Sequence, residues 1–227
     1  MIELFNMDCM EAMLKMKDKE YDLAICDPPY SGAGNDEWLN KDRGRFGGGS
    51  RFDKYKIERT GGTWAEKYGK EIRHWDIAPD AKYFNELFRI SKNQIIWGAN
   101  YFKNIPPHRC FIVWRKLTIS ENFSMAMAEY AYCSFNENAK VFEYQPQDTK
   151  RFHPTQKPIK LYEWLLLNYA KKGDKILDTH GGSMSIAIAC HNLGFDLTLF
   201  ELDKDYFEAG KKRLEEHQKQ ERMFGLL

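Results

Sequence analysis

Short apolar runs recur along this chain, each bounded by polar or turn-forming residues. Runs of this length and setting are typical of strands buried inside a sheet. Several of them are followed at once by an acidic residue, which places carboxylates at strand ends. The pattern predicts strands over residues 2–7, 21–26, 94–97, 111–114, 129–135, 175–177 and 196–200.

Between these runs, apolar residues recur at helical spacing, as at Tyr83, Leu87 and Ile90. Strands that alternate with helices predict an α/β fold, with a mostly parallel twisted sheet and helices on both faces. We expect one antiparallel strand, at 129–135, and a loop over 140–156. Helices are predicted over residues 79–90, 158–170, 183–193 and from about 203 onward, with a short one ending at 16.

Neither a repeat nor a linker divides the chain, so we expect one domain over residues 1–227. Its 43% hydrophobic residues exclude global disorder. Because the formal net charge is only +1, binding to nucleic acid would depend on a local basic patch.

The five cysteines are widely spaced and include no C-x-x-C pair. This usage predicts buried free thiols in a reducing compartment, and neither a metal site nor a disulfide framework. The N-terminal residues do not resemble a signal peptide, and no apolar run approaches a membrane span. We therefore expect a cytoplasmic protein.

The most informative residues are Asp27, Pro28, Pro29 and Tyr30, which follow the strand predicted at 21–26. Proline fixes φ and has no N–H, so the carbonyls of this turn are left to accept hydrogen bonds from a ligand. Tyr30 offers a face for stacking and Asp27 an anionic acceptor. A turn of this kind suits a flat ring that carries an amine, whereas the simpler interpretation is a proline-rich turn after a strand.

A second site is indicated where a predicted strand, a glycine turn and a helix follow one another over residues 176–183. Small residues let the backbone approach a ligand, and the start of a helix offers free N–H donors. Glu201 ends the next strand, nineteen residues after Gly182, where an acidic residue accepts ribose hydroxyls in Rossmann-like sites. By itself this pattern fits a nucleoside site and an ordinary strand–helix turn equally well, and the absence of G-x-G-x-x-G argues against a dinucleotide.

Two further segments have the character of a binding site. Asp8 and Cys9 end the first predicted strand, where a carboxylate could accept from an exocyclic amine, although Asp8 is equally suited to cap a helix. His-Pro-Thr-Gln-Lys-Pro at 153–158 leads into a predicted helix, and its alternative is a proline-bounded loop with a threonine cap.

Together these segments resemble the S-adenosylmethionine-dependent DNA amino methyltransferases. The shared motifs are Asp-Pro-Pro-Tyr at 27–30, the run at 153–158, and Leu-Asp-x-x-x-Gly-Ser at 177–183. Their order, with the catalytic turn first, is similar to the beta-type permutation of that family. The resemblance covers about residues 1–30 and 80–215. It implies a Rossmann-like methyltransferase fold that methylates the N6 amine of a flipped-out adenine in DNA, as in restriction–modification.

The resemblance also implies roles for individual residues. Asp27, Pro28, Pro29 and Tyr30 hold the target base. By the same resemblance, Asp178, Gly182 and Ser183 line the methionine side of the cofactor, Glu201 takes the ribose, Asp8 with Cys9 takes the adenine, and the run 155–157 closes the pocket. These cofactor-binding candidates are Asp8, Cys9, Asp27, Thr155, Lys157, Asp178, His180, Gly182, Ser183, Glu201 and Leu202.

The glycine turn departs from the family pattern Asp-Pro-Phe-x-Gly-Ser-Gly. This chain has Thr179, His180 and Met184 where the pattern has proline, phenylalanine and the last glycine. A histidine ring can stack flat as the phenylalanine would, so we expect His180 to bind cofactor and not to act as a catalytic base.

Residues 31–78 form a long insertion rich in glycine and charge. Within it, the segment 41–59, here called the basic segment, holds seven basic and three acidic side chains, a net +4, with three aromatic residues among them. Basic groups for phosphates and rings for bases are typical of nucleic-acid contacts, and the alternative is a solvated loop. The candidate DNA-binding residues are Arg43, Arg45, Arg51, Lys54, Lys56 and Arg59.

Several alternatives stay open at this point. The turn at 27–30 could equally hold the amine of cytosine in an N4 enzyme, although by the resemblance aspartate at position 27 favours adenine. The turn does not distinguish DNA from RNA, or a duplex from a single strand. A non-catalytic DNA-binding homologue and a homodimer are also compatible with the sequence.

Overall fold

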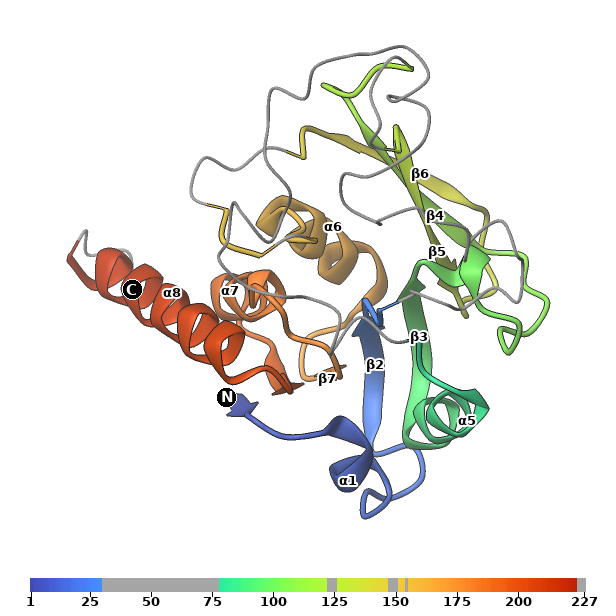
Figure 1. Cartoon of the computed structure of the whole chain (residues 1–227), viewed down its shortest axis with the longest axis horizontal. Helices are drawn as coiled ribbons and strands as arrows, with labels where there is room; N and C mark the ends of the chain where they lie inside the picture. Colours follow the sequence, from blue (N-terminus) through green and yellow to red (C-terminus); the bar gives the residue numbers. More distant parts are fainter. Residues whose placement is uncertain (30–77, 122–125, 147–150, 154, 224–227) are drawn as a thin grey trace, which may run out of the picture.

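The computed structural model describes residues 1–29, 78–121, 126–146, 151–153 and 155–223 (Figure 1). Within them, the strands form an eight-stranded sheet in the order β1-β8-β7-β2-β3-β5-β4-β6. The strands are β1 (Ile2–Phe5), β2 (Tyr21–Cys26), β3 (Ser91–Trp97), β4 (Phe111–Lys116), β5 (Ala128–Cys133), β6 (Lys140–Tyr144), β7 (Lys175–Asp178) and β8 (Asp196–Phe200). The helices are α1 (Cys9–Met13), α5 (Ala81–Ile90), α6 (Ile159–Tyr169), α7 (Ser185–Leu193) and α8 (Lys204–Met223), with a 3₁₀ turn η1 (Ala99–Tyr101).

Strand β5 is the antiparallel member of this sheet. It pairs antiparallel with both β3 and β4, while the other neighbouring strands pair in parallel. The predicted fold class, a mostly parallel sheet with one antiparallel strand, is confirmed.

The sheet is covered by helices on both faces, as predicted (Figure 1). Along β2, Leu23 and Ile25 belong to the core beneath α6, α7 and α8, while Ala24 and Cys26 belong to the core beneath α1 and α5. A central parallel strand is thus apolar on both sides, which explains why it appears in the sequence as a continuous apolar run. The five cysteines are free and buried in these cores.

The prediction of a loop over 140–156 is wrong at its start, because 140–144 form strand β6. This strand pairs in parallel with β4 at the edge of the sheet. Val141 is 61% exposed, whereas the ring of Phe142 packs against Trp164 of α6 at 5.4 Å. Since only one face of this short edge strand is covered, its sequence lacks an apolar run.

Helices α1, α5, α6 and α7 are each two or three residues shorter than predicted. Helix α1 ends at Met13, and α7 begins at Ser185 because Met184 has a left-handed backbone, with φ 56°. Gly194 ends α7 in the same conformation, with φ 72°, directly after the predicted helix end at residue 193. No helix within the described residues is both long enough and apolar enough to span a membrane.

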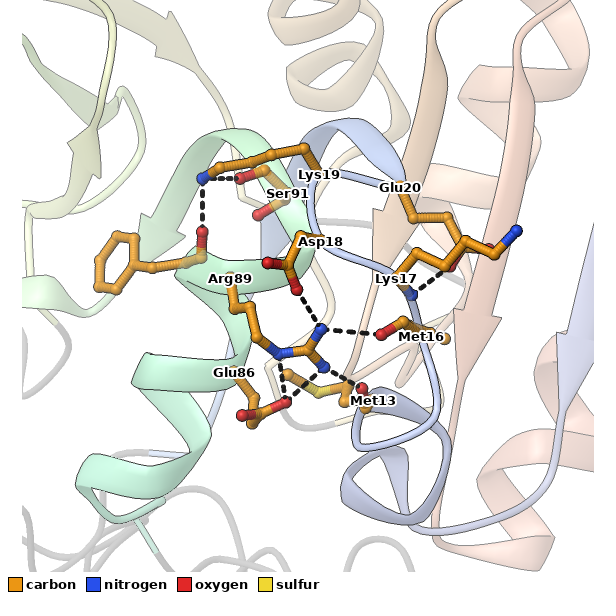
Figure 2. A network of polar contacts seen from close by, with 10 residues as sticks. Met13, Met16, Lys17, Asp18, Lys19, Glu20, Glu86, Arg89 and Ser91 are labelled. Carbon is orange, nitrogen blue, oxygen red and sulfur yellow. Dashed lines mark hydrogen bonds and ion pairs between the residues drawn. The ribbon is translucent and has the colours of Figure 1, made fainter.

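The C-terminal end of α5 is tied to the segment between α1 and β2 by Arg89 (Figure 2). Its guanidinium donates to the carbonyls of Met13 and Met16, at 2.8 Å each, and pairs with Asp18. Lys19 donates back to a carbonyl in α5. These bonds fix α1 and α5 relative to each other on one face of the sheet.

Candidate active site

A cavity of about 440 Å³ lies where β1, β2, β7 and β8 end. Its wall includes the residues that directly follow these strands, together with Tyr83 of α5 and Tyr206 of α8. The carboxyl ends of parallel strands are where open α/β sheets bind their ligands. The position of the cavity therefore agrees with the expectation from the sequence.

Most of the predicted site residues meet in this one cavity. Those in its wall are Asp8, Cys9, Asp27, Pro28, Pro29, Thr155, Lys157, His180, Gly182, Ser183, Glu201 and Leu202. Asp178 lies behind the wall, 2% exposed. The remaining predicted residues lie outside the described part of the chain: Tyr30, Arg43, Arg45, Arg51, Lys54, Lys56 and Arg59.

Asp27, directly after β2, has two oxygens in different surroundings. Oδ2 forms an ion pair with the ammonium of Lys157. Oδ1 is buried and has no hydrogen-bond partner among the described residues. Burial raises the pKa of Asp27, against the lowering effect of Lys157. The structure thus leaves one buried acceptor of this carboxylate for a ligand that donates.

Lys157 extends the ion pair into the interior. Its ammonium lies 3.1 Å from Oε2 of Glu129 on β5, and Oε1 of Glu129 lies 2.6 Å from the ammonium of Lys116 on β4. Burial acts to raise the pKa of Glu129, but Lys157 and Lys116 lower it to about 2. The sequence predicted neither Glu129 nor Lys116 as part of a site, although both are charged residues within otherwise apolar strands.

The glycine turn after β7 is closely packed. The carboxylate of Glu201 accepts the N–H of Gly182 at 2.7 Å and that of Asp203 at 2.8 Å. Gly182 has φ +49°, and a Cβ there would lie 3.3 Å from the ring of His153. The turn therefore needs glycine, and it presents bare backbone to the cavity beside a carboxylate whose oxygens can accept further bonds.

His180 sits at the end of a short hydrogen-bonded chain. The hydroxyl of Tyr83 lies 2.6 Å from Oγ1 of Thr179, which lies 2.9 Å from Nδ1 of His180. Burial lowers the pKa of His180 to about 4, so the ring is neutral near pH 7. A neutral, oriented ring suits the stacking role predicted from the sequence. The sequence indicated Tyr83 only as one of the apolar residues at helical spacing, and not as part of a site.

Asp8 fulfils both interpretations offered by the sequence. It caps α1 by accepting the N–H of Met10 at 2.8 Å, and it also lines the cavity. Cys9 beside it is a neutral thiol, because burial raises its pKa to about 12.

Asp178 is a buried acid next to other acids. It accepts the N–H of His180 at 3.0 Å. Burial raises its pKa from 3.8 to about 8, assisted by the charges of Asp27 and Glu201. The native protein therefore holds a proton on Asp178 over a pH range in which an unfolded chain would release it.

We expect Asp178→Asn to remove a pH-dependent loss of stability. In the wild type the native state binds the extra proton between pH 3.8 and about 8, so stability falls as pH rises through this window. Asparagine keeps the acceptor and cannot ionise. The Tm of the variant relative to that of the wild type should therefore increase as pH rises from about 5 to about 8. Thermal unfolding followed by circular dichroism measures this.

Asp22→Asn provides the control of opposite sign. A hydrogen bond from Lys92 lowers the pKa of Asp22, so its contribution is present above its unfolded pKa and is lost toward acid. This variant should lose Tm near neutral pH and approach the wild type in acid. Parallel Tm curves for Asp178→Asn and the wild type would contradict the assignment of a buried, protonated Asp178.

The sheet is open and mostly parallel, a glycine turn follows β7, Glu201 follows β8, and a cavity lies at the strand ends. Together these features define a Rossmann-like α/β protein that binds a nucleoside-containing ligand. A family model described as DNA methylase, for N6 and N4 enzymes, matches residues 108–212. Over these residues the chain is similar to the N6/N4 DNA methylases, and this similarity supports an S-adenosylmethionine-dependent DNA methyltransferase.

The chain is similar to several known proteins. It is 24% identical to the type II methyltransferase M.HpaI of Haemophilus parainfluenzae, over 92% of this chain and 72% of that one. The structure of an M1.HpyAVI–SAM complex matches with a TM-score of 0.57 and 22% identity, over 94% and 100% of the two chains. PvuII DNA methyltransferase, described as cytosine-N4-specific, matches with a TM-score of 0.57 and 12% identity, over 96% and 90%.

The described residues fit S-adenosylmethionine as the cofactor. Cavities of some hundreds of Å³ commonly hold small ligands. Here the bare backbone at Gly182, where a Cβ would crowd His153, lies beside the Glu201 carboxylate. These groups supply the close approach and the acceptor that a nucleoside with a charged tail requires.

Proposed function

We propose that this protein transfers a methyl group from S-adenosylmethionine to the N6 amine of adenine in DNA, as a type II modification methyltransferase does. The observation that carries the proposal is Asp27, whose Oδ2 is held by Lys157 while Oδ1 is buried without a partner among the described residues. A buried acceptor left unpaired is costly, so an N–H donor in the cavity would stabilise it. The exocyclic amine of a base is such a donor.

The turn after β2 accounts for the chemistry. The amine of adenine is a weak nucleophile because its lone pair is conjugated with the ring. Asp27 accepts one N–H and the carbonyl of Pro28 the other, which directs the lone pair out of the ring plane. Bound S-adenosylmethionine supplies an electrophilic methyl group on its sulfonium. The amine would form its bond to the methyl group as the bond from sulfur breaks, which would leave a neutral thioether, and it would release one proton toward solvent. Asp27 thus orients the amine and need not act as a strong base.

The other cavity residues hold the cofactor in this proposal. Gly182 and Ser183, with Asp178 behind them, face the methionine part. Glu201, with Leu202 beside it, takes the ribose, Asp8 and Cys9 take the adenine, and His180 stacks. Thr155 and Lys157 close the pocket, although the ammonium of Lys157 is directed to carboxylates. All these groups belong to one proposed domain, residues 1–227.

The target base must leave its stack before it can reach Asp27. We propose that Tyr30 stacks on the base and that the basic segment contacts the DNA. These residues lie outside the described part of the chain, but Pro29 and Ala78, at the two ends of the insertion, both line the cavity. The insertion thus starts and finishes at the active-site wall.

Deleting residues 41–59 should weaken DNA binding and flatten its salt dependence. Each phosphate contact that is lost reduces the slope of log K against log salt concentration by about 0.9. Fluorescence anisotropy with labelled DNA at several salt concentrations measures both quantities. A full-length variant with the six candidate residues changed to glutamine separates charge from length. Unchanged affinity and slope in both variants would contradict the assignment.

Cytosine-N4 methylation is the second candidate function, because the same acceptors would hold either amine and PvuII methyltransferase shares the fold. Incubation with labelled S-adenosylmethionine and unmethylated DNA, followed by nucleoside mass spectrometry, distinguishes the two. N6-methyladenine is the expected product, and N4-methylcytosine would overturn the base assignment. Cofactor binding without any methylated nucleoside would indicate a non-catalytic DNA-binding homologue.

A further inference from the structure

From the cavity wall inward, four charged side chains of alternating sign form a continuous chain. Asp27 pairs with Lys157, Lys157 with Glu129 at 3.1 Å, and Glu129 with Lys116 at 2.6 Å. The two lysine side chains are only 2% and 7% exposed. The residues come from the ends of β2 and β4, from the start of β5, and from the segment before α6.

This arrangement contains more buried charge than a single neutral pair requires. Asp27 and Lys157 alone would balance, yet Glu129 and Lys116 add two further charges at the cost of their desolvation. The two ammonium groups lie near indole rings, Lys157 at 5.4 Å from Trp97 and Lys116 at 5.1 Å from Trp114. The proposed methyl transfer gives Glu129 and Lys116 no direct task.

Glu129 competes with Asp27 for the same ammonium group. Because Lys157 donates to carboxylates on both sides, it engages Oδ2 of Asp27, and Oδ1 has no partner among the described residues. Lys116 in turn neutralises Glu129, so that Glu129 attracts Lys157 without adding net charge to the site.

We propose that Glu129, held by Lys116, is a positioning residue that keeps Lys157 shared between two carboxylates, so that one oxygen of Asp27 stays reserved for the target amine. This inference rests on the proposed role of Asp27 in holding that amine. It concerns residues that do not touch the substrate and act through Lys157.

The charges around Asp27 predict opposite effects for two substitutions. Lys157 and Lys116 favour the ionised form of Asp27, whereas Glu129 opposes it. Asp178, which is protonated, and the buried Tyr162 hydroxyl also face it and are neutral near pH 7. Glu129→Gln should therefore lower the titration midpoint of Asp27 by about one unit, and Lys116→Met should raise it by about as much.

The first experiment needs no ligand. The protein is labelled with ¹³C at aspartate carboxyls and titrated by NMR, and the Asp27 resonance is assigned by its loss in Asp27→Asn. The expected result is a fall in midpoint for Glu129→Gln, a rise for Lys116→Met, and a return toward the wild type in the double variant, which restores neutrality. Glu143→Gln removes an exposed ion pair with Arg115 on neighbouring strands and serves as the matched control.

The second experiment measures methyl transfer against pH with the same variants. We expect kcat of Glu129→Gln to fall on the order of tenfold while the Kd of S-adenosylmethionine is unchanged, as when a supporting partner is lost. The acid limb of the profile should move in opposite directions for Glu129→Gln and Lys116→Met.

The two experiments separate this inference from the proposed function. An Asp27 midpoint that stays at the wild-type value in both single variants would overturn the role of Glu129, whether or not the protein methylates DNA. Shifted midpoints support it even if the wild type yields no methylated base, in which case the proposed function alone fails. An active wild type with unchanged kcat and pH profiles in both variants would also overturn it.

Discussion

Asp27→Asn is expected to lower the rate of methyl transfer on the order of a thousandfold while binding of S-adenosylmethionine persists. Asparagine has the shape of aspartate but one acceptor instead of two. If its oxygen faces Lys157, its NH₂ group opposes the amine of the target base. If it is turned around, the NH₂ group faces the ammonium of Lys157. In neither orientation are both partners satisfied. Asp27→Ala should abolish methyl transfer for the same reason, since it removes both acceptors.

Single-turnover methylation measures the rate, and calorimetric titration measures cofactor affinity. Asp174→Asn, at a partly exposed residue in the turn before β7, is the matched control and should behave as the wild type. Circular dichroism verifies that the variants fold. Full activity in Asp27→Asn or Asp27→Ala would sink the assignment of Asp27 as the group that holds the amine.

Lys157→Met is expected to cause the largest loss of stability, about 3–5 kcal/mol, because it leaves two buried carboxylates without the ammonium between them. Lys157 and Lys116 hold the pKa of Glu129 at about 2, against burial. A lowered carboxyl pKa contributes stability above the unfolded value of 4.5, and this contribution disappears as pH falls toward about 2. The deficit of the variant should therefore be greatest near neutral pH and shrink in acid.

Urea denaturation at several pH values gives the free energy of unfolding. Lys160→Met, which removes the ion pair of the exposed Lys160 with Glu163 on α6, is the control and should change stability little. A Lys157→Met variant as stable as the wild type at neutral pH would show that the buried charges do not depend on this lysine.

The sequence predicted most of the fold because its central strands are buried on both sides. β2 and β8 have the predicted bounds, Tyr21–Cys26 and Asp196–Phe200. Strand β6 was not predicted, because an edge strand that is covered on only one face has no continuous apolar run. The start of α7 was predicted two residues too early, because Met184 adopts a left-handed backbone conformation that is expected mainly of glycine and asparagine.

The site was predictable where local turns carry the chemistry and not where distant elements meet. Asp27, Gly182 and Glu201 each belong to a strand–turn motif that can be recognised in isolation. The pairing of Lys157 with Glu129 depends on β5 running antiparallel beside β3, and this brings its first residues to the active-site edge. Spacing along the chain carries no information on such a contact.

The two anchors of the insertion have a consequence for how this protein can diversify. Pro29 and Ala78, which flank residues 30–77, both line the cavity wall, and α5 then begins at a helix cap provided by Asp80 and is fastened at its far end by Arg89. Neither fastening involves residues 30–77. The proposed DNA contacts lie within that interval, so substitutions there are expected to change DNA binding without loosening either fastening of α5.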